Sequence, residues 1–141
     1  PAMMSQFTDG AFGDAHVRIF HLTNQLIAHF YIIIIPFDDL KHIAEKAQKH
    51  DAWILADEIY TRLVYDGMGS APSIASIDGM LDRTIIADGF SKTFSMTGWR
   101  LGWTVAPRDV ADRLLAFTSS TIFGCCQFVQ DAASQALVNN E

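Results

Sequence analysis

One lysine and one arginine stand close together in a loop of small and aromatic residues at positions 88–103. Lys92 follows Ser91, and Arg100 comes eight positions after the lysine, just beyond Thr97 and Gly98. The planar guanidinium of an arginine binds phosphate through paired, charge-assisted hydrogen bonds. A lysine in a polar loop is more often a solvated surface residue, and it is the spacing to Arg100 that favours a binding site for a phosphorylated small molecule.

A second candidate motif lies upstream, where the apolar run 52–56 stops at two acidic residues. Asp57 and Tyr60 follow this run and can both face a site at the end of a strand. The alternative is that Asp57 caps the following turn and that Tyr60 is an ordinary, partly buried aromatic residue. The motif alone does not decide between the two interpretations.

Taken together, the acid, the tyrosine, the lysine and the arginine, in this order, resemble the aspartate-aminotransferase-like family of pyridoxal-phosphate enzymes. These enzymes are also called fold type I, class I and II aminotransferases. The resemblance covers about residues 37–141, and its most specific parts are positions 57–60 and 91–102. It implies an α/β fold with a three-layer α/β/α large domain, whose sheet is mostly parallel with one antiparallel strand.

The resemblance also implies a cofactor, pyridoxal 5′-phosphate, and a role for each matched residue. Lys92 forms the internal aldimine with the cofactor and later moves a proton, so it counts as catalytic. Asp57 pairs with the pyridine nitrogen, and Tyr60 bonds the 3-oxygen of the ring. Arg100 binds the phosphate, and Ser91 supports the phosphate loop.

Two departures from the family pattern affect the cofactor site. Many members carry Ser or Thr three residues before the lysine, where this chain has Gly89. We therefore place Gly89 among the cofactor-binding residues through its backbone, and expect phosphate binding to depend more on Arg100 and Ser91. The Asn-Pro-Thr-Gly turn of the family, expected before the helix at about 38–50, is absent.

The implied function is that of an aminotransferase, or a core fragment of one, which transfers an amino group between an amino acid and a 2-oxo acid. Two alternatives remain: a related fold type I lyase or synthase, and a non-catalytic α/β fragment that retains the motifs. The run Thr-Gly-Trp-Arg at 97–100 favours the transferases. The resemblance implies a homodimer for the parent protein. It also implies that this chain alone does not complete the reaction cycle, because the family's substrate-carboxylate arginine lies in a part not found here.

Strands and helices that would position these residues follow from the apolar pattern. β-prone runs predict strands at 31–35, 52–56, 84–87 and 101–106. The family fold that the resemblance implies makes the last of them the antiparallel strand. Apolar residues at helical spacing predict a helix from about 38, capped by Asp38 or Asp39, that joins the first two strands in a β-α-β unit. Two more helices are predicted, one after Pro107 and one at 127–138 with Phe128, Ala132, Ala136 and Leu137 as its packing stripe.

We divide the chain into residues 1–30, which carry no motif, and 31–141, a partial cofactor-binding large domain. The net charge of −6 argues against nucleic acid and anionic membranes as partners. The cysteines are adjacent, at 125 and 126, which disfavours a structural disulfide and fits a reducing cytoplasm. Five histidines without tight ligand spacing make a metal site unexpected.

Overall fold

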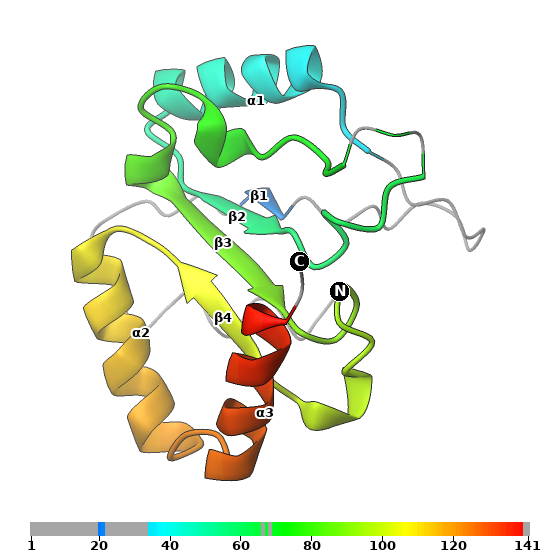
Figure 1. Cartoon of the computed structure of the whole chain (residues 1–141). Helices are drawn as coiled ribbons and strands as arrows, with labels where there is room; N and C mark the ends of the chain where they lie inside the picture. The colour runs from blue at the N-terminus through cyan, green and yellow to red at the C-terminus, as the bar shows by residue number, and fades with distance from the viewer. Residues whose placement is uncertain (1–19, 22–33, 66, 68, 140–141) are drawn as a thin grey trace, which may run out of the picture.

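In the part of the chain that the structure describes, the sheet contains three parallel strands and one antiparallel strand. The computed structural model describes residues 20–21, 34–65, 67 and 69–139 (Figure 1). Its four-stranded sheet has the order β1 (Phe20–His21), β2 (Ile54–Asp57), β3 (Thr84–Gly89) and β4 (Gly102–Val105). β1, β2 and β3 are parallel, whereas β4 is antiparallel to β3. The mostly parallel sheet and its antiparallel strand near 101–106 are thereby confirmed.

Helix α1 (Phe37–Lys49) covers one face of the sheet, on the same side as the segment that precedes β3 (Figure 1). Its residues Leu40, Ala44 and Ala47 are buried at the spacing of one helix face. The core that they form also contains apolar side chains from β2 and from the segment before β3: Ala52, Ile54, Ala56, Ile74 and Met80. This packing holds the carboxyl end of β2, and with it Asp57, at a defined place.

The start of α1 differs from the prediction. Pro36 is the N-cap, and its carbonyl oxygen accepts the N–H of Leu40 at 3.1 Å. Asp38 and Asp39 lie in the first turn and do not cap the helix; Asp38 instead pairs with Lys41 at 3.0 Å. The φ of −59° at Pro36 is close to the helical value and favours the start of a helix. Asp38 and Asp39 in the first turn interact favourably with the positive end of the helix dipole.

The predicted parallel partner of β2 also differs. Residues 31–33 of the predicted strand 31–35 lie outside the described residues, and Ile34 and Ile35 are not in a strand. Ile35 packs against the core beneath α1 instead. β1 pairs with β2, with Phe20 opposite Ile54, so the segment 1–30 supplies a strand that no sequence pattern predicted.

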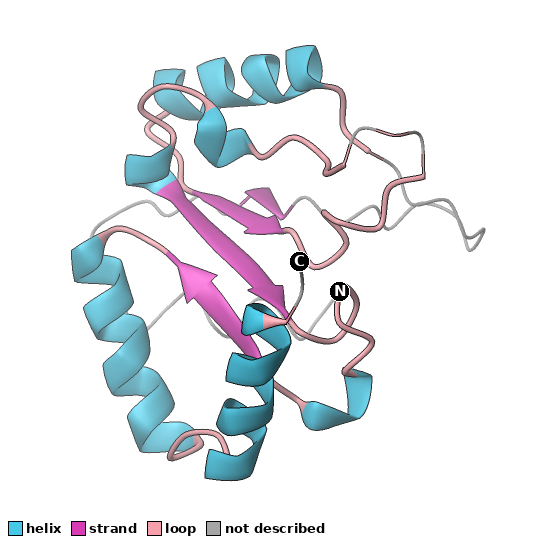
Figure 2. Ribbon diagram, in the orientation of Figure 1, coloured by secondary structure: helices cyan, strands magenta, loops and turns pink. Residues whose placement is uncertain are grey.

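Helices α2 (Arg108–Thr121) and α3 (Gln127–Val138) lie beside β4, on the other side of the sheet from α1 (Figures 1 and 2). Their positions confirm the predicted helices. The predicted stripe on α3 is wrong, because Phe128 and Leu137 are exposed while Val129 and Ala133 are the buried side chains. Val129 and Ala133 lie four residues apart, so they share one face of the helix. No helix among the described residues is long and apolar enough to cross a membrane.

Strands β3 and β4 approach closely where two glycines face each other. Gly89 pairs with Gly102 in the antiparallel register, and Gly89 is buried. A Cβ atom on Gly102 would lie 2.7 Å from the carbonyl oxygen of Asp88, and one on Gly89 would lie 2.9 Å from Cα of Gly102. These contacts are with backbone atoms, so a side chain at either position forces the strands apart.

We therefore expect Gly102→Ala to lower the free energy of unfolding by about 1–3 kcal/mol, the usual cost of overpacking. Gly98→Ala is the matched control, because a Cβ there would meet nothing within 4 Å. Urea unfolding followed by tryptophan fluorescence measures both variants. Equal stability of the two variants would contradict the close approach of β3 and β4.

Candidate active site

The carboxyl end of β2 presents Asp57 at the edge of the sheet. The backbone N–H of Glu58 donates to the carbonyl of Ala87 on β3 at 2.9 Å, so strand pairing continues one residue beyond β2. The chain then turns, with the N–H of Thr61 donating to the carbonyl of Glu58 at 2.9 Å. Asp57 is exposed, and its Oδ1 accepts the N–H of Ile59 at 3.4 Å. The turn thus leaves the Asp57 carboxylate free to meet a ligand.

The loop between β3 and β4 carries Ser91, Lys92 and Arg100, and an aromatic cluster holds it. Phe90 is buried and packs against Phe94 and Trp103, with ring centres 4.9 and 5.1 Å apart. The backbone N–H of Phe90 donates to Leu101, and its carbonyl accepts from Met96, both at 3.2 Å. These bonds tie the start of the loop to its end. The loop is therefore a closed, packed turn, which fits residues that must be held in place for chemistry.

The loop and the end of β2 form a single cleft. Asp57 enters it from β2, and Ser91, Lys92 and Arg100 enter it from the β3–β4 loop. Its volume is about 340 Å³, within the usual range for small-molecule sites. The cleft joins a carboxylate to an amine and a guanidinium, so it can hold a ligand that carries a cationic group and an anionic group.

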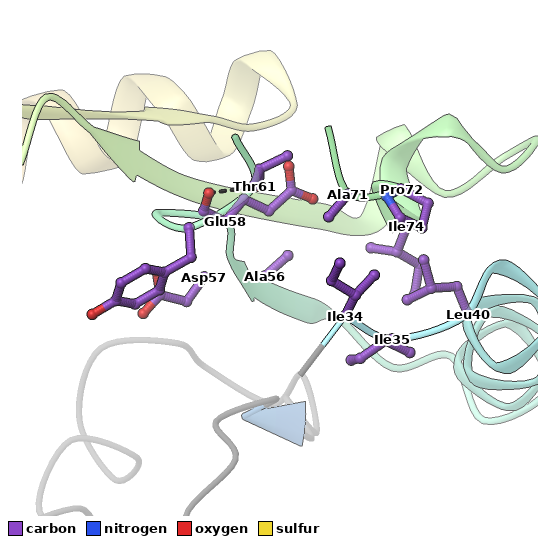
Figure 3. A pocket seen from close by; sticks show the side chains of 11 residues that line it. Ile34, Ile35, Leu40, Ala56, Asp57, Glu58, Thr61, Ala71, Pro72 and Ile74 are labelled. Carbon is purple, nitrogen blue, oxygen red and sulfur yellow. Dashed lines mark hydrogen bonds between the residues drawn. The ribbon is translucent and has the colours of Figure 1, made fainter. Parts of the chain in front are cut away.

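Tyr60 stands between this cleft and a neighbouring hollow. The ammonium nitrogen of Lys92 lies 5.4 Å from the centre of the Tyr60 ring, at cation–π distance. Tyr60 lines the neighbouring hollow, which Figure 3 shows, and Asp57 lines both. Asp57, Lys92 and Arg100 thus line one cleft, with Tyr60 beside Lys92. The fold brings them together although 40 positions separate Tyr60 from Arg100.

The backbone of Arg100 is in the left-handed region, with φ of 52° and ψ of 44°. A residue other than glycine in this region costs of order 1–3 kcal/mol and persists only when its surroundings enforce it. One guanidinium nitrogen donates to the carbonyl of Thr97 at 3.0 Å, which leaves the remaining N–H groups for a ligand. A strained backbone that aims a cation into a cleft favours a functional role for Arg100.

The structure places Gly89 outside the cleft. Gly89 is the last residue of β3, and its space is taken by Gly102 and by the carbonyl of Leu101. This explains why a hydroxyl-bearing side chain cannot stand at position 89 in this chain. The cofactor-binding role of Gly89 stays a prediction, whereas its packing role follows from the geometry.

Sequence reasoning did not assign four further residues that line the cleft: the apolar Ile59 and Ala87, and the polar Asp88 and Thr97. Asp88 lies on β3 and accepts the N–H of Gly89 at 2.6 Å. An acid near the carboxyl end of a predicted strand is a signal that could have identified it. Thr97 lies between the lysine and the arginine in the motif, so its spacing was the available signal.

One acidic group near the cleft has a shifted protonation equilibrium. Burial raises the pKa of Glu58, and the carboxylate of Asp88 adds to the increase. A hydrogen bond from Ser73 acts in the opposite direction. Glu58, the neighbour of Asp57, therefore loses its proton less readily than an exposed glutamate does.

Comparisons with known proteins connect this chain to a family. The family model for aminotransferase class I and II matches residues 33–141. Over 104 residues the chain is 50% identical to aromatic-amino-acid aminotransferase 2 of Thermococcus litoralis and 44% identical to aspartate aminotransferase of Pyrococcus abyssi. Each alignment covers 74% of this chain and 26% of the relative. The chain thus spans about a quarter of the length of these curated relatives.

Solved structures show the same fold. The aromatic aminotransferase from Pyrococcus horikoshii matches with a TM-score of 0.69 and 43% identity, over 73% of this chain and 27% of that one. A structure described as Pyrococcus protein-A1 matches with a TM-score of 0.72 and 41% identity, over 77% of this chain and 28% of that one. The fold is that of the large domain of fold type I aminotransferases. The chain belongs to the aminotransferase class I and II family, whose members generally depend on pyridoxal phosphate.

Proposed function

We propose that this chain is the cofactor-binding core of a pyridoxal-phosphate-dependent aminotransferase, with residues 31–141 as part of its large domain. Lys92, Asp57 and Tyr60 are the catalytic residues of this proposal, and Arg100 and Ser91 bind the cofactor with them. The observation that carries it is the cleft in which Asp57 meets Ser91, Lys92 and Arg100. The names of the relatives support amino acids and 2-oxo acids as the substrate class.

The residues of the cleft fit the chemical groups of pyridoxal 5′-phosphate. Its phosphate is an anion that an arginine and a serine hydroxyl can bind, its ring nitrogen becomes cationic when protonated, and its aldehyde reacts with an amine. Arg100, Asp57 and Lys92 supply these three partners within one cleft. When bound, the cofactor supplies an electron sink for the bond that breaks at the substrate Cα.

The chain's own residues would then hold charges and move a proton. The Asp57 carboxylate stabilises a proton on the ring nitrogen, and the phenol of Tyr60 donates to the ring oxygen. Lys92 is half-buried and lines the cleft, so its amine would be available to a ligand bound there. As a neutral amine, Lys92 would be able to move a proton between the substrate Cα and C4′ of the cofactor.

A half-reaction with analysis of both products tests this proposal. The chain, loaded with pyridoxal 5′-phosphate, is mixed with single amino acids, and mass spectrometry measures the products. We expect pyridoxamine 5′-phosphate and one 2-oxo acid in equal amounts, formed slowly because no described residue is assigned to clamp the substrate carboxylate. A heat-unfolded sample gives the uncatalysed background.

The alternatives give different products. An elimination or replacement product with unchanged cofactor would identify a lyase or synthase, and a failure to bind the cofactor would identify a non-catalytic fragment.

A homodimeric parent protein and a cytoplasmic location complete the proposal. The assembly can be tested on the parent protein by its mass in solution.

A further inference from the structure

Glu58 follows the proposed catalytic residue Asp57 directly, yet its side chain takes another direction. Asp57 is exposed at the cleft, whereas Glu58 is half-buried. Figure 3 shows the Glu58 carboxylate directed toward Ala71 and Pro72, on the other side of the chain from Asp57. Both acids line the hollow of Figure 3, but of the two only Asp57 also lines the cofactor cleft.

Glu58 joins the turn after β2 to β3 and to the segment before β3. Its N–H donates to Ala87 on β3 at 2.9 Å. Its carbonyl accepts the N–H of Thr61 at 2.9 Å and the hydroxyl of Thr61 at 2.6 Å. Its carboxylate accepts the hydroxyl of Ser73 at 2.5 Å, across 15 positions of sequence. Backbone and side chain of one residue thus connect β3, the turn 57–61 and the segment before β3.

Ser73 is itself held in a fixed orientation. Its hydroxyl oxygen accepts the N–H of Ala75 at 3.2 Å, as the cap of the short 3₁₀ helix Ile74–Ser76. Ile74 in this helix is buried in the core beneath α1. The N–H of Ala71 donates to the carbonyl of Thr61 at 2.8 Å and makes a second link between the two segments. The hydrogen bond from Ser73 therefore connects Glu58 to a rigid part of the core.

The carboxylate is not explained by ion pairing. The ion pairs of the described residues join Lys41 to Asp38, Arg83 to Asp51 and Arg108 to Asp112, so Glu58 takes part in none of them. Burial and the charge of Asp88 both disfavour the ionised form. A half-buried acid without a cation costs stability, and such a cost is commonly found where a group is needed for function.

We propose that Glu58, through its hydrogen bond with Ser73, is a positioning residue that holds the turn 57–61 so that Asp57 lines the cofactor cleft and Tyr60 stays beside Lys92. The proposal rests on the proposed function for the identity of the ligand. The positioning of the turn itself can be measured without any ligand. Glu58 acts through Asp57 and Tyr60 and does not touch the ligand.

The first measurement is amide hydrogen exchange of the free chain. Glu58→Ala and Ser73→Ala should speed exchange at Thr61 and Ala71, because both remove the shared hydrogen bond. Glu58→Gln should keep the slow exchange of the wild type, because its amide oxygen can accept the same bond. Glu45→Ala, on the exposed face of α1, is the matched control.

The second measurement is a double-mutant cycle on cofactor affinity. Asp57→Asn should weaken pyridoxal 5′-phosphate in the wild-type chain, and this effect should shrink on the order of tenfold in the Glu58→Ala background. Glu58→Gln should restore the full effect of Asp57→Asn. If Glu58→Ala only lowered the general stability of the chain, Asp57→Asn would weaken cofactor binding by the same factor with and without Glu58→Ala.

The outcomes separate the positioning role from the proposed function. If the wild-type chain binds no cofactor, the proposed function fails, and the exchange rates at Thr61 and Ala71 still decide whether Glu58 holds the turn. Unchanged exchange in both Glu58→Ala and Ser73→Ala would overturn the inference, as would additive effects in the cycle. Failure of Glu58→Gln to retain wild-type exchange would also overturn it.

Discussion

Lys92→Arg should abolish the covalent bond between this chain and pyridoxal 5′-phosphate. The guanidinium keeps its proton at all accessible pH values, so it cannot attack the cofactor's aldehyde, although it preserves the positive charge beside Tyr60. Borohydride reduction of the chain with the cofactor, followed by digestion and mass spectrometry, measures the bond. In the wild type we expect the phosphopyridoxyl group on Lys92, and in the variant we expect none.

The matched control is Lys41→Arg on the exposed surface of α1, which should keep the full label on Lys92. The wild-type digest also tests the choice of lysine, because Lys46 and Lys49 are exposed and therefore open to attack. A label on either of these in place of Lys92 would refute the assignment. Retention of the label in Lys92→Arg would refute it equally.

Arg100→Ala should weaken pyridoxal 5′-phosphate far more than it weakens pyridoxal, which lacks the phosphate. Hydrogen bonds to charged groups contribute about 1.5–3 kcal/mol, so we expect a selective loss of roughly 10- to 150-fold. The effect should be at the upper end of this range, because Gly89 offers no hydroxyl to share the phosphate and its position has no space for one. Titration followed by cofactor absorbance gives both affinities.

Arg113→Ala on the exposed side of α2 is the control, since it removes an arginine without changing the cleft. The backbone adds a second control. Alanine at position 100 must also adopt the left-handed conformation, so any general disturbance of the loop weakens both ligands. Equal losses for pyridoxal and its phosphate would therefore show that Arg100 does not bind the phosphate.

Local patterns in the sequence determined most of the elements and the residues of the candidate site. Residues 127–138 form α3 within the predicted bounds, although another face is buried, and the run after Arg100 forms the antiparallel strand. The order and spacing of Asp57, Tyr60, Lys92 and Arg100 led to the family, which the comparisons confirm. These features depend on neighbouring residues, because propensity, period and motif spacing are all encoded within a short stretch of chain.

Only the tertiary structure decided which strands pair, which residues face each other and which face of a helix is buried. The pairing of β1 with β2 and the meeting of Gly89 with Gly102 join parts of the chain that no local pattern relates. The burial of Val129 in place of Phe128 likewise follows from no local pattern. The bond between Glu58 and Ser73 spans 15 positions in the same way. Strand register and the face that a helix buries are set by how whole elements pack, so they become visible only when the chain is folded.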